Sequence, residues 1–88
     1  MRTAREKLLD NVMEPDEIVL INDEALNESL VGVSSDMRAI YDYEKMAEEL
    51  AEHYGYELVD ARDYIDYNII GSLSTMGRRA PIIMDTLL

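Results

Sequence analysis

The chain has no cysteine, tryptophan or phenylalanine, and its 88 residues include only 8 basic side chains against 19 acidic ones. Without cysteine there are no disulfide bonds and no thiolate zinc sites, which fits a reducing compartment. The formal net charge of -11 argues against direct binding of nucleic acid. No stretch approaches the roughly 20 apolar residues of a transmembrane helix, and the first residues lack the apolar run of a signal peptide. We therefore expect a cytoplasmic protein without a membrane-spanning segment.

What the chain does contain is typical of one small globular domain covering residues 1–88. Hydrophobic residues make up 48% of the sequence, so the acidity is expected on a folded surface rather than in a disordered chain. Six tyrosines supply every aromatic ring. A buried tyrosine needs a partner for its hydroxyl, so several of them are expected to be half-exposed.

The first third of the chain predicts three short elements. A helix is expected over Thr3 to Met13, where Thr3 and Glu6 have the spacing of a capping box. The branched apolar run Ile18 to Ile21 predicts a buried strand. The segment from Glu24 to Ser29 is either a single helical turn or an irregular loop.

A hairpin and a final strand are predicted on either side of the longer helices. Leu30 to Ser34 and Arg38 to Tyr41 form the hairpin, with Ser35 and Asp36 in the turn. Pro81 to Met84 reads as a short strand, and proline at its start places it at a sheet edge.

Two amphipathic helices are predicted between the hairpin and the last strand. Asp42 is a favoured N-cap and Gly55 a favoured residue just beyond a helix C-terminus. Between them apolar side chains recur at helical spacing, at Tyr43, Met46, Ala47, Leu50, Ala51 and Tyr54. A second helix is expected over about Leu58 to Leu73, with an inward stripe of Leu58, Ala61, Ile65, Ile69 and either Leu73 or Ser72.

This order of elements predicts an α+β domain. We expect a small, mainly antiparallel sheet of three to four strands, with two to three helices packed on one face.

The excess charge is concentrated in two segments. Residues 14–30 carry six acidic and no basic side chains, and residues 41–67 carry nine acidic and two basic ones. The second segment interleaves carboxylates with aromatic rings, in a set that we call the acidic–tyrosine series: Tyr41, Asp42, Tyr43, Glu44, Glu48, Glu49, Glu52, Tyr56, Asp60, Asp63, Tyr64, Asp66 and Tyr67.

Spaced carboxylates can imitate a phosphate backbone and occupy a basic groove meant for nucleic acid. Tyrosine supplies contact area at a low cost in conformational entropy. The candidate partner-binding residues are therefore Glu44, Glu48, Glu49, Glu52, Asp60, Asp63, Tyr64 and Tyr67. The simpler alternative is that these residues form solvated helix faces that keep a small domain soluble.

No pattern for catalysis or for a cofactor is present. His53 is the single histidine, and no serine or threonine is marked as its nucleophile. The acidic pairs Asp16-Glu17 and Asp23-Glu24 lack the spacing of a calcium-binding loop. The four glycines are scattered, so no phosphate-binding loop is predicted. We expect a protein that is not an enzyme and has no catalytic residues, metal or cofactor.

Several short pieces within residues 30–84 resemble a group of small acidic proteins of phages and prophages of gut bacteria. The pieces are VGVSSD, YDYEKM, IDYN and APIIM. The chain departs from that pattern at Met37, where glycine would suit the turn, and at Ile70-Gly71, where better helix formers are expected. No function is assigned to the group, so the resemblance implies only a viral or mobile-element origin and an intracellular setting.

Two functions follow as hypotheses. In the first, a phage-type binding protein docks its acidic face on a basic protein surface. Its target would be a host nucleic-acid-binding complex, such as a CRISPR effector or a restriction enzyme. In the second, the chain is a small homodimeric assembly module with an interface of Ile82, Ile83, Met84, Leu87 and Leu88.

Overall fold

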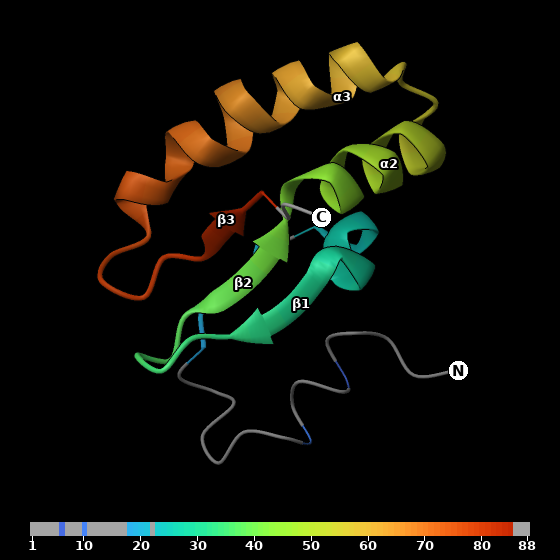
Figure 1. Cartoon of the computed structure of the whole chain (residues 1–88). Helices are drawn as coiled ribbons and strands as arrows, with labels where there is room; N and C mark the ends of the chain where they lie inside the picture. Colours follow the sequence, from blue (N-terminus) through green and yellow to red (C-terminus); the bar gives the residue numbers. More distant parts are fainter. Residues whose placement is uncertain (1–5, 7–9, 11–17, 22, 86–88) are drawn as a thin grey trace.

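A three-stranded sheet is the base on which the helices are arranged (Figure 1). The computed structural model describes residues 18–21 and 23–85 together with Glu6 and Asp10. The strands β1 (Leu30–Val33), β2 (Ala39–Asp42) and β3 (Ile82–Met84) lie in the order β1-β2-β3. With helices α2 (Tyr43–Tyr54) and α3 (Leu58–Tyr64) on the same side of this sheet, the α+β prediction is confirmed.

The sheet is mixed, because its two strand pairs have opposite senses. β1 and β2 pair antiparallel, whereas β2 and β3 pair parallel, with Ile40 opposite Ile82 and Asp42 opposite Met84. A parallel pair needs a long crossover connection. Here α2 and α3 provide it, carrying the chain away from the end of β2 and back to the start of β3 (Figure 1).

The predicted hairpin is confirmed, and its turn contains one unusual backbone conformation. The Ser34 N–H donates to the Arg38 carbonyl at 2.8 Å, and the Met37 N–H donates to the Ser34 carbonyl at 3.0 Å. Met37 has φ 64°, in the left-handed region that glycine adopts most easily. A register shift between Leu30 and Gly32 forms a bulge in β1.

Helix α2 begins and ends where the sequence predicts. The Asp42 side chain accepts hydrogen bonds from the N–H groups of Glu44 and Lys45, at 3.0 and 3.5 Å. Gly55 ends the helix with φ 74°. Met46, Ala47 and Leu50 from the predicted stripe are buried.

The second predicted helix changes its winding along its length. Regular α-helix ends at Tyr64, and it is followed by a π-helical turn η3 (Ile65–Ile69) and a 3₁₀ segment η4 (Ile70–Thr75). The Ile70 N–H donates to the Ile65 carbonyl, five residues back. The buried stripe Ala61, Ile65 and Ile69 has a spacing of four, longer than the 3.6 residues of an α-helical turn. A wider turn keeps Ile65 and Ile69 on the buried side.

The core lies between the sheet and the helices. It is formed by Ile18, Leu26, Leu30, Ala39, Tyr41, Met46, Ala47, Leu50, Ala61, Ile65 and Ile69. The 3₁₀ helix η2 (Glu24–Ser29) contributes Leu26 and settles the open choice at this segment in favour of a helix.

The strand predicted over Ile18 to Ile21 is wrong, because this segment has no strand conformation. Its apolar character serves side-chain burial instead, since Ile18 is buried and Leu20 and Ile21 pack against the core. The Ile21 N–H donates to the Tyr41 hydroxyl at 3.2 Å rather than to a neighbouring strand.

The helix predicted over Thr3 to Met13 lies outside the described residues, apart from Glu6 and Asp10. Within the described part of the chain, no helix has the length and apolar character needed to cross a membrane.

Candidate functional site

An ion pair connects α2 and α3 next to the predicted acidic residues. The Arg62 Nη2 atom donates to Glu44 Oε2 at 3.1 Å, and this interaction raises the pKa of the Arg62 guanidinium. The charge of Glu44 is therefore balanced within the molecule by Arg62. Arg62 was not among the predicted site residues, because the sequence alone does not show which carboxylate forms an ion pair with this arginine.

The other three predicted glutamates of α2 lie beyond this ion pair. These are Glu48, Glu49 and Glu52. Glu48 and Glu52 follow Glu44 at intervals of four, so they continue the row that Glu44 begins along the helix. Glu48 and Glu52 are exposed, and Glu49 is only half-exposed. Among the described residues, none of these three carboxylates has a hydrogen-bond or ion-pair partner. Two of them, Glu48 and Glu52, are therefore accessible to a partner molecule.

Tyr43 joins the two helices next to the ion pair. Its hydroxyl donates to Asp66 Oδ1 at 3.0 Å and lies 3.4 Å from the Arg62 carbonyl oxygen. Burial and the hydrogen bond to Asp66 raise the pKa of the Tyr43 hydroxyl. Two other members of the acidic–tyrosine series are not surface residues: Tyr41 is 2% exposed, and Asp42 is the buried N-cap of α2.

A row of aromatic rings runs from the end of α2 to α3. The Tyr54 and Tyr56 rings are stacked with centroids 5.7 Å apart, and the Tyr56 and Tyr64 rings are 6.1 Å apart. The exposed side chain of His53 makes an edge contact with Tyr54. The row gives the turn between the two helices an aromatic face.

Tyr54 also anchors this end of the helix pair to η2. Its hydroxyl lies 3.1 and 3.2 Å from the two carboxylate oxygens of Asp23, which raises the pKa of Tyr54. The Asp23 side chain also caps η2 by accepting from the Ala25 N–H at 3.0 Å. Asp23 is thus a structural residue, and the described residues contain no cluster of acidic or histidine side chains suited to a metal. The pair Asp16-Glu17 lies outside them.

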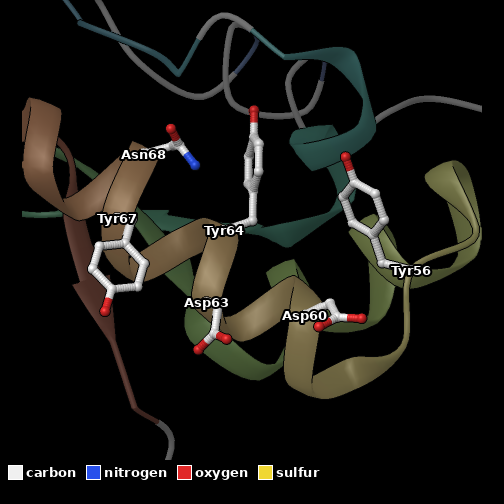
Figure 2. A pocket seen from close by; sticks show the side chains of 6 residues that line it. All are labelled: Tyr56, Asp60, Asp63, Tyr64, Tyr67 and Asn68. Carbon is white, nitrogen blue, oxygen red and sulfur yellow. The ribbon is translucent and has the colours of Figure 1, made fainter.

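The four predicted residues of the second helix come together in one groove. Asp60, Asp63, Tyr64 and Tyr67 line it with Tyr56 and Asn68, and it is a shallow groove, open to solvent, with a volume of about 250 Å³. Figure 2 shows Tyr56 and Tyr64 extending in one direction and Asp63 and Tyr67 extending in the opposite direction, with Asp60 between Tyr56 and Asp63. The spacing 56, 60, 64 and 68 repeats every four residues, which is the sequence signal for including Asn68.

Comparison of the chain with protein-family models, curated protein sequences and solved structures finds no match. The chemistry of the site therefore comes from its own residues. They form a surface of exposed carboxylates and tyrosine rings on two helices, beside the ion pair between Glu44 and Arg62.

Proposed function

We propose that this protein is a non-enzymatic binding protein that docks the acidic face of α2 and α3 on a basic surface of a partner protein. The observation that carries the proposal is that Glu48, Glu52, Asp60 and Asp63 are exposed and have no ion-pair partner among the described residues. The partner that we favour is a host nucleic-acid-binding complex, such as a CRISPR effector or a restriction enzyme, which this protein would inhibit. The acidic face would then occupy the site of the DNA or RNA backbone, inside the cell.

The placement of these charges is unfavourable for the isolated domain. Glutamates spaced by four along a helix repel one another, and a carboxylate near the C-terminus of a helix opposes the helix dipole. Glu52 combines both features, since it lies one turn after Glu48 in the last turn of α2. Basic residues on a partner surface would attract these carboxylates, offset their mutual repulsion and speed association.

The tyrosines supply what charge alone does not. Tyr67 is 81% exposed and Tyr56 is 39% exposed, so both rings are available for contact. Tyrosine is enriched in the central residues of protein interfaces, where its ring is buried and its hydroxyl forms hydrogen bonds. An acidic surface that served solubility alone would not need exposed rings between its carboxylates.

Capture from a bacterial lysate tests the proposal when matched variants are compared. Glu48→Gln/Glu52→Gln removes two charges from the proposed face, and Asp36→Asn/Asp85→Asn removes two charges from the hairpin turn and the residue after β3. Each tagged protein is washed at low and at high salt, and the retained proteins are identified by mass spectrometry.

We expect the wild type and the Asp36/Asp85 variant to retain the same nucleic-acid-handling protein at low salt and to release it at high salt. The Glu48/Glu52 variant should retain much less of it, and the purified target should lose its nucleic acid when the wild type is added. Equal retention by both double variants would contradict the proposal.

A homo-oligomeric assembly module is the second candidate, and the open edge of the sheet favours it. β3 has no neighbour on its outer side among the described strands, and Met84 is 37% exposed at its end. Unpaired strand edges can template pairing with another chain. Leu87 and Leu88 of the predicted interface lie outside the described residues. Sedimentation at increasing concentration tests this candidate, and a chain that stays monomeric would exclude it.

A further inference from the structure

The groove on α3 differs chemically from the rest of the acidic face. Its lining combines three tyrosine rings, two carboxylates and one amide, and contains no cationic side chain. The carboxylates accept hydrogen bonds without donating them, and the tyrosine and asparagine oxygens add further acceptors. The matching ligand is therefore a hydrogen-bond donor that carries positive charge and has a face that stacks on an aromatic ring.

We infer that this groove is a binding site for an arginine side chain of a partner protein, with the guanidinium stacked on a tyrosine ring and hydrogen-bonded to Asp60 or Asp63. The assignment deepens the proposed function and rests on it, because it names the partner side chain that the acidic face recognises.

Guanidinium fits this lining better than ammonium for two reasons. It is planar and weakly hydrated, so it stacks on aromatic faces, whereas the lysine ammonium is a compact and strongly hydrated charge. Its forked donors also match a carboxylate at two points. Asp60 and Asp63 are three residues apart on α3 and are both exposed, so a guanidinium over the groove has a carboxylate within one helical turn in either direction.

Cation–π attraction requires a ring face that other side chains do not cover. Tyr56 and Tyr64 lie 6.1 Å apart at an interplanar angle of 40°, so they support each other without sealing both faces. Tyr67 is 81% exposed and makes no ring contact with another described aromatic residue. It is the most accessible ring for a cation within about 6 Å of its centroid.

A titration followed by NMR tests the inference without the partner. The probes are three capped tripeptides, acetyl-Gly-Xaa-Gly-amide, with arginine, lysine or citrulline at the centre. Citrulline keeps the shape of arginine but is neutral. We expect saturable shifts of the Tyr56, Tyr64 and Tyr67 ring signals with the arginine peptide, weaker binding of the lysine peptide, and no saturable shift with citrulline.

Variants locate the site on the protein. Tyr67→Ala and Asp63→Asn should each weaken binding of the arginine peptide roughly 2- to 5-fold, the effect of one exposed cation–π contact or a similar loss of charge attraction. Asp85→Asn alters an exposed carboxylate after β3, outside both the groove and the acidic face, and should leave the affinity unchanged. Both altered groove positions are exposed, and the amide spectrum of each variant verifies its fold.

The inference is overturned if lysine binds as tightly as arginine, if citrulline binds equally well, or if Tyr67→Ala and Asp63→Asn bind like the wild type. These results would leave the proposed function standing whenever loss of Glu48 and Glu52 still abolishes partner capture. Conversely, if the groove binds the arginine peptide specifically but no partner is captured in a charge-dependent way, the proposed function of the wider acidic face is wrong and the arginine site still stands.

Discussion

Replacing Glu52 by lysine should stabilise the protein, although it reverses a charge on the proposed binding face. Glu52 lies in the last turn of α2, where the partial charge of the helix end is negative. Its neighbours one turn earlier are Glu48 and Glu49, both acidic and neither paired among the described residues. Glu52→Lys turns two repulsions into attractions and places a cation at the favourable end of the helix.

The size of the effect follows from these three contributions. A pair of charges three or four residues apart contributes about 0.2–0.5 kcal/mol, and a charge at a helix end contributes about 0.3–1 kcal/mol at low ionic strength. Exposure and screening place each contribution near its lower limit. We expect a gain of about 1 kcal/mol in the free energy of unfolding, which corresponds to a rise in Tm of about 4–8 °C in a domain of this size.

Thermal unfolding followed by circular dichroism measures this gain, first in dilute buffer and then in about 1 M NaCl, where screening acts within about 3 Å. Glu44→Lys is the matched control, because Glu44 lies in the first turn of α2 and is bound to Arg62. The control should lower Tm. A lower Tm for Glu52→Lys, or a gain that persists undiminished in high salt, would refute this electrostatic account.

Three further changes test other contacts. Tyr54→Phe should make the loss of stability at high pH shallower. The hydrogen bond to Asp23 raises the Tyr54 pKa above 10.0, so the stability that this bond contributes is complete below about pH 10 and is lost as the pH rises through the folded pKa. Urea unfolding of both proteins at neutral and alkaline pH measures this loss. Identical pH profiles for the variant and the wild type would contradict the prediction. Gly55→Ala should lower the free energy of unfolding by about 1 kcal/mol, because φ at this residue is 74°. No atom outside the adjoining residues crowds the new methyl group, so the loss would come from the backbone alone. Unchanged stability in urea unfolding would argue against a left-handed cap. Tyr41→Phe should cost about 1 kcal/mol and speed amide exchange at Ile21, whose N–H loses its acceptor; unchanged exchange would mean that the bond is absent in solution.

The Glu52 experiment also bears on function. A variant that is more stable yet no longer captures a partner would separate the fold from binding. Such a trade-off is expected where a surface is kept for recognition rather than for stability. If Glu52→Lys instead gained stability with no loss of any interaction, the acidic face would revert to a means of keeping the domain soluble.

Local signals were sufficient wherever one segment decides its own structure. Asp42 and Gly55 set both ends of α2, because capping depends on backbone groups only a few residues away. The hairpin was predictable for the same reason. At Ile18 to Ile21 the local pattern was misleading, since an apolar run is equally compatible with a strand and with an extended segment packed against the core.

The sequence by itself determined the α+β class, the excess of acid, and the helix positions at which Asp60, Asp63 and Tyr67 face outward, because composition and periodicity are properties of single segments. Only the tertiary structure decided that Glu44 is paired with Arg62, that Tyr54 is bound to Asp23, and that a groove forms on α3. These contacts depend on how α2, α3 and η2 pack. That packing is fixed by the shared burial of Leu26, Leu50 and Ile65, residues that are far apart in the chain and meet only in the core.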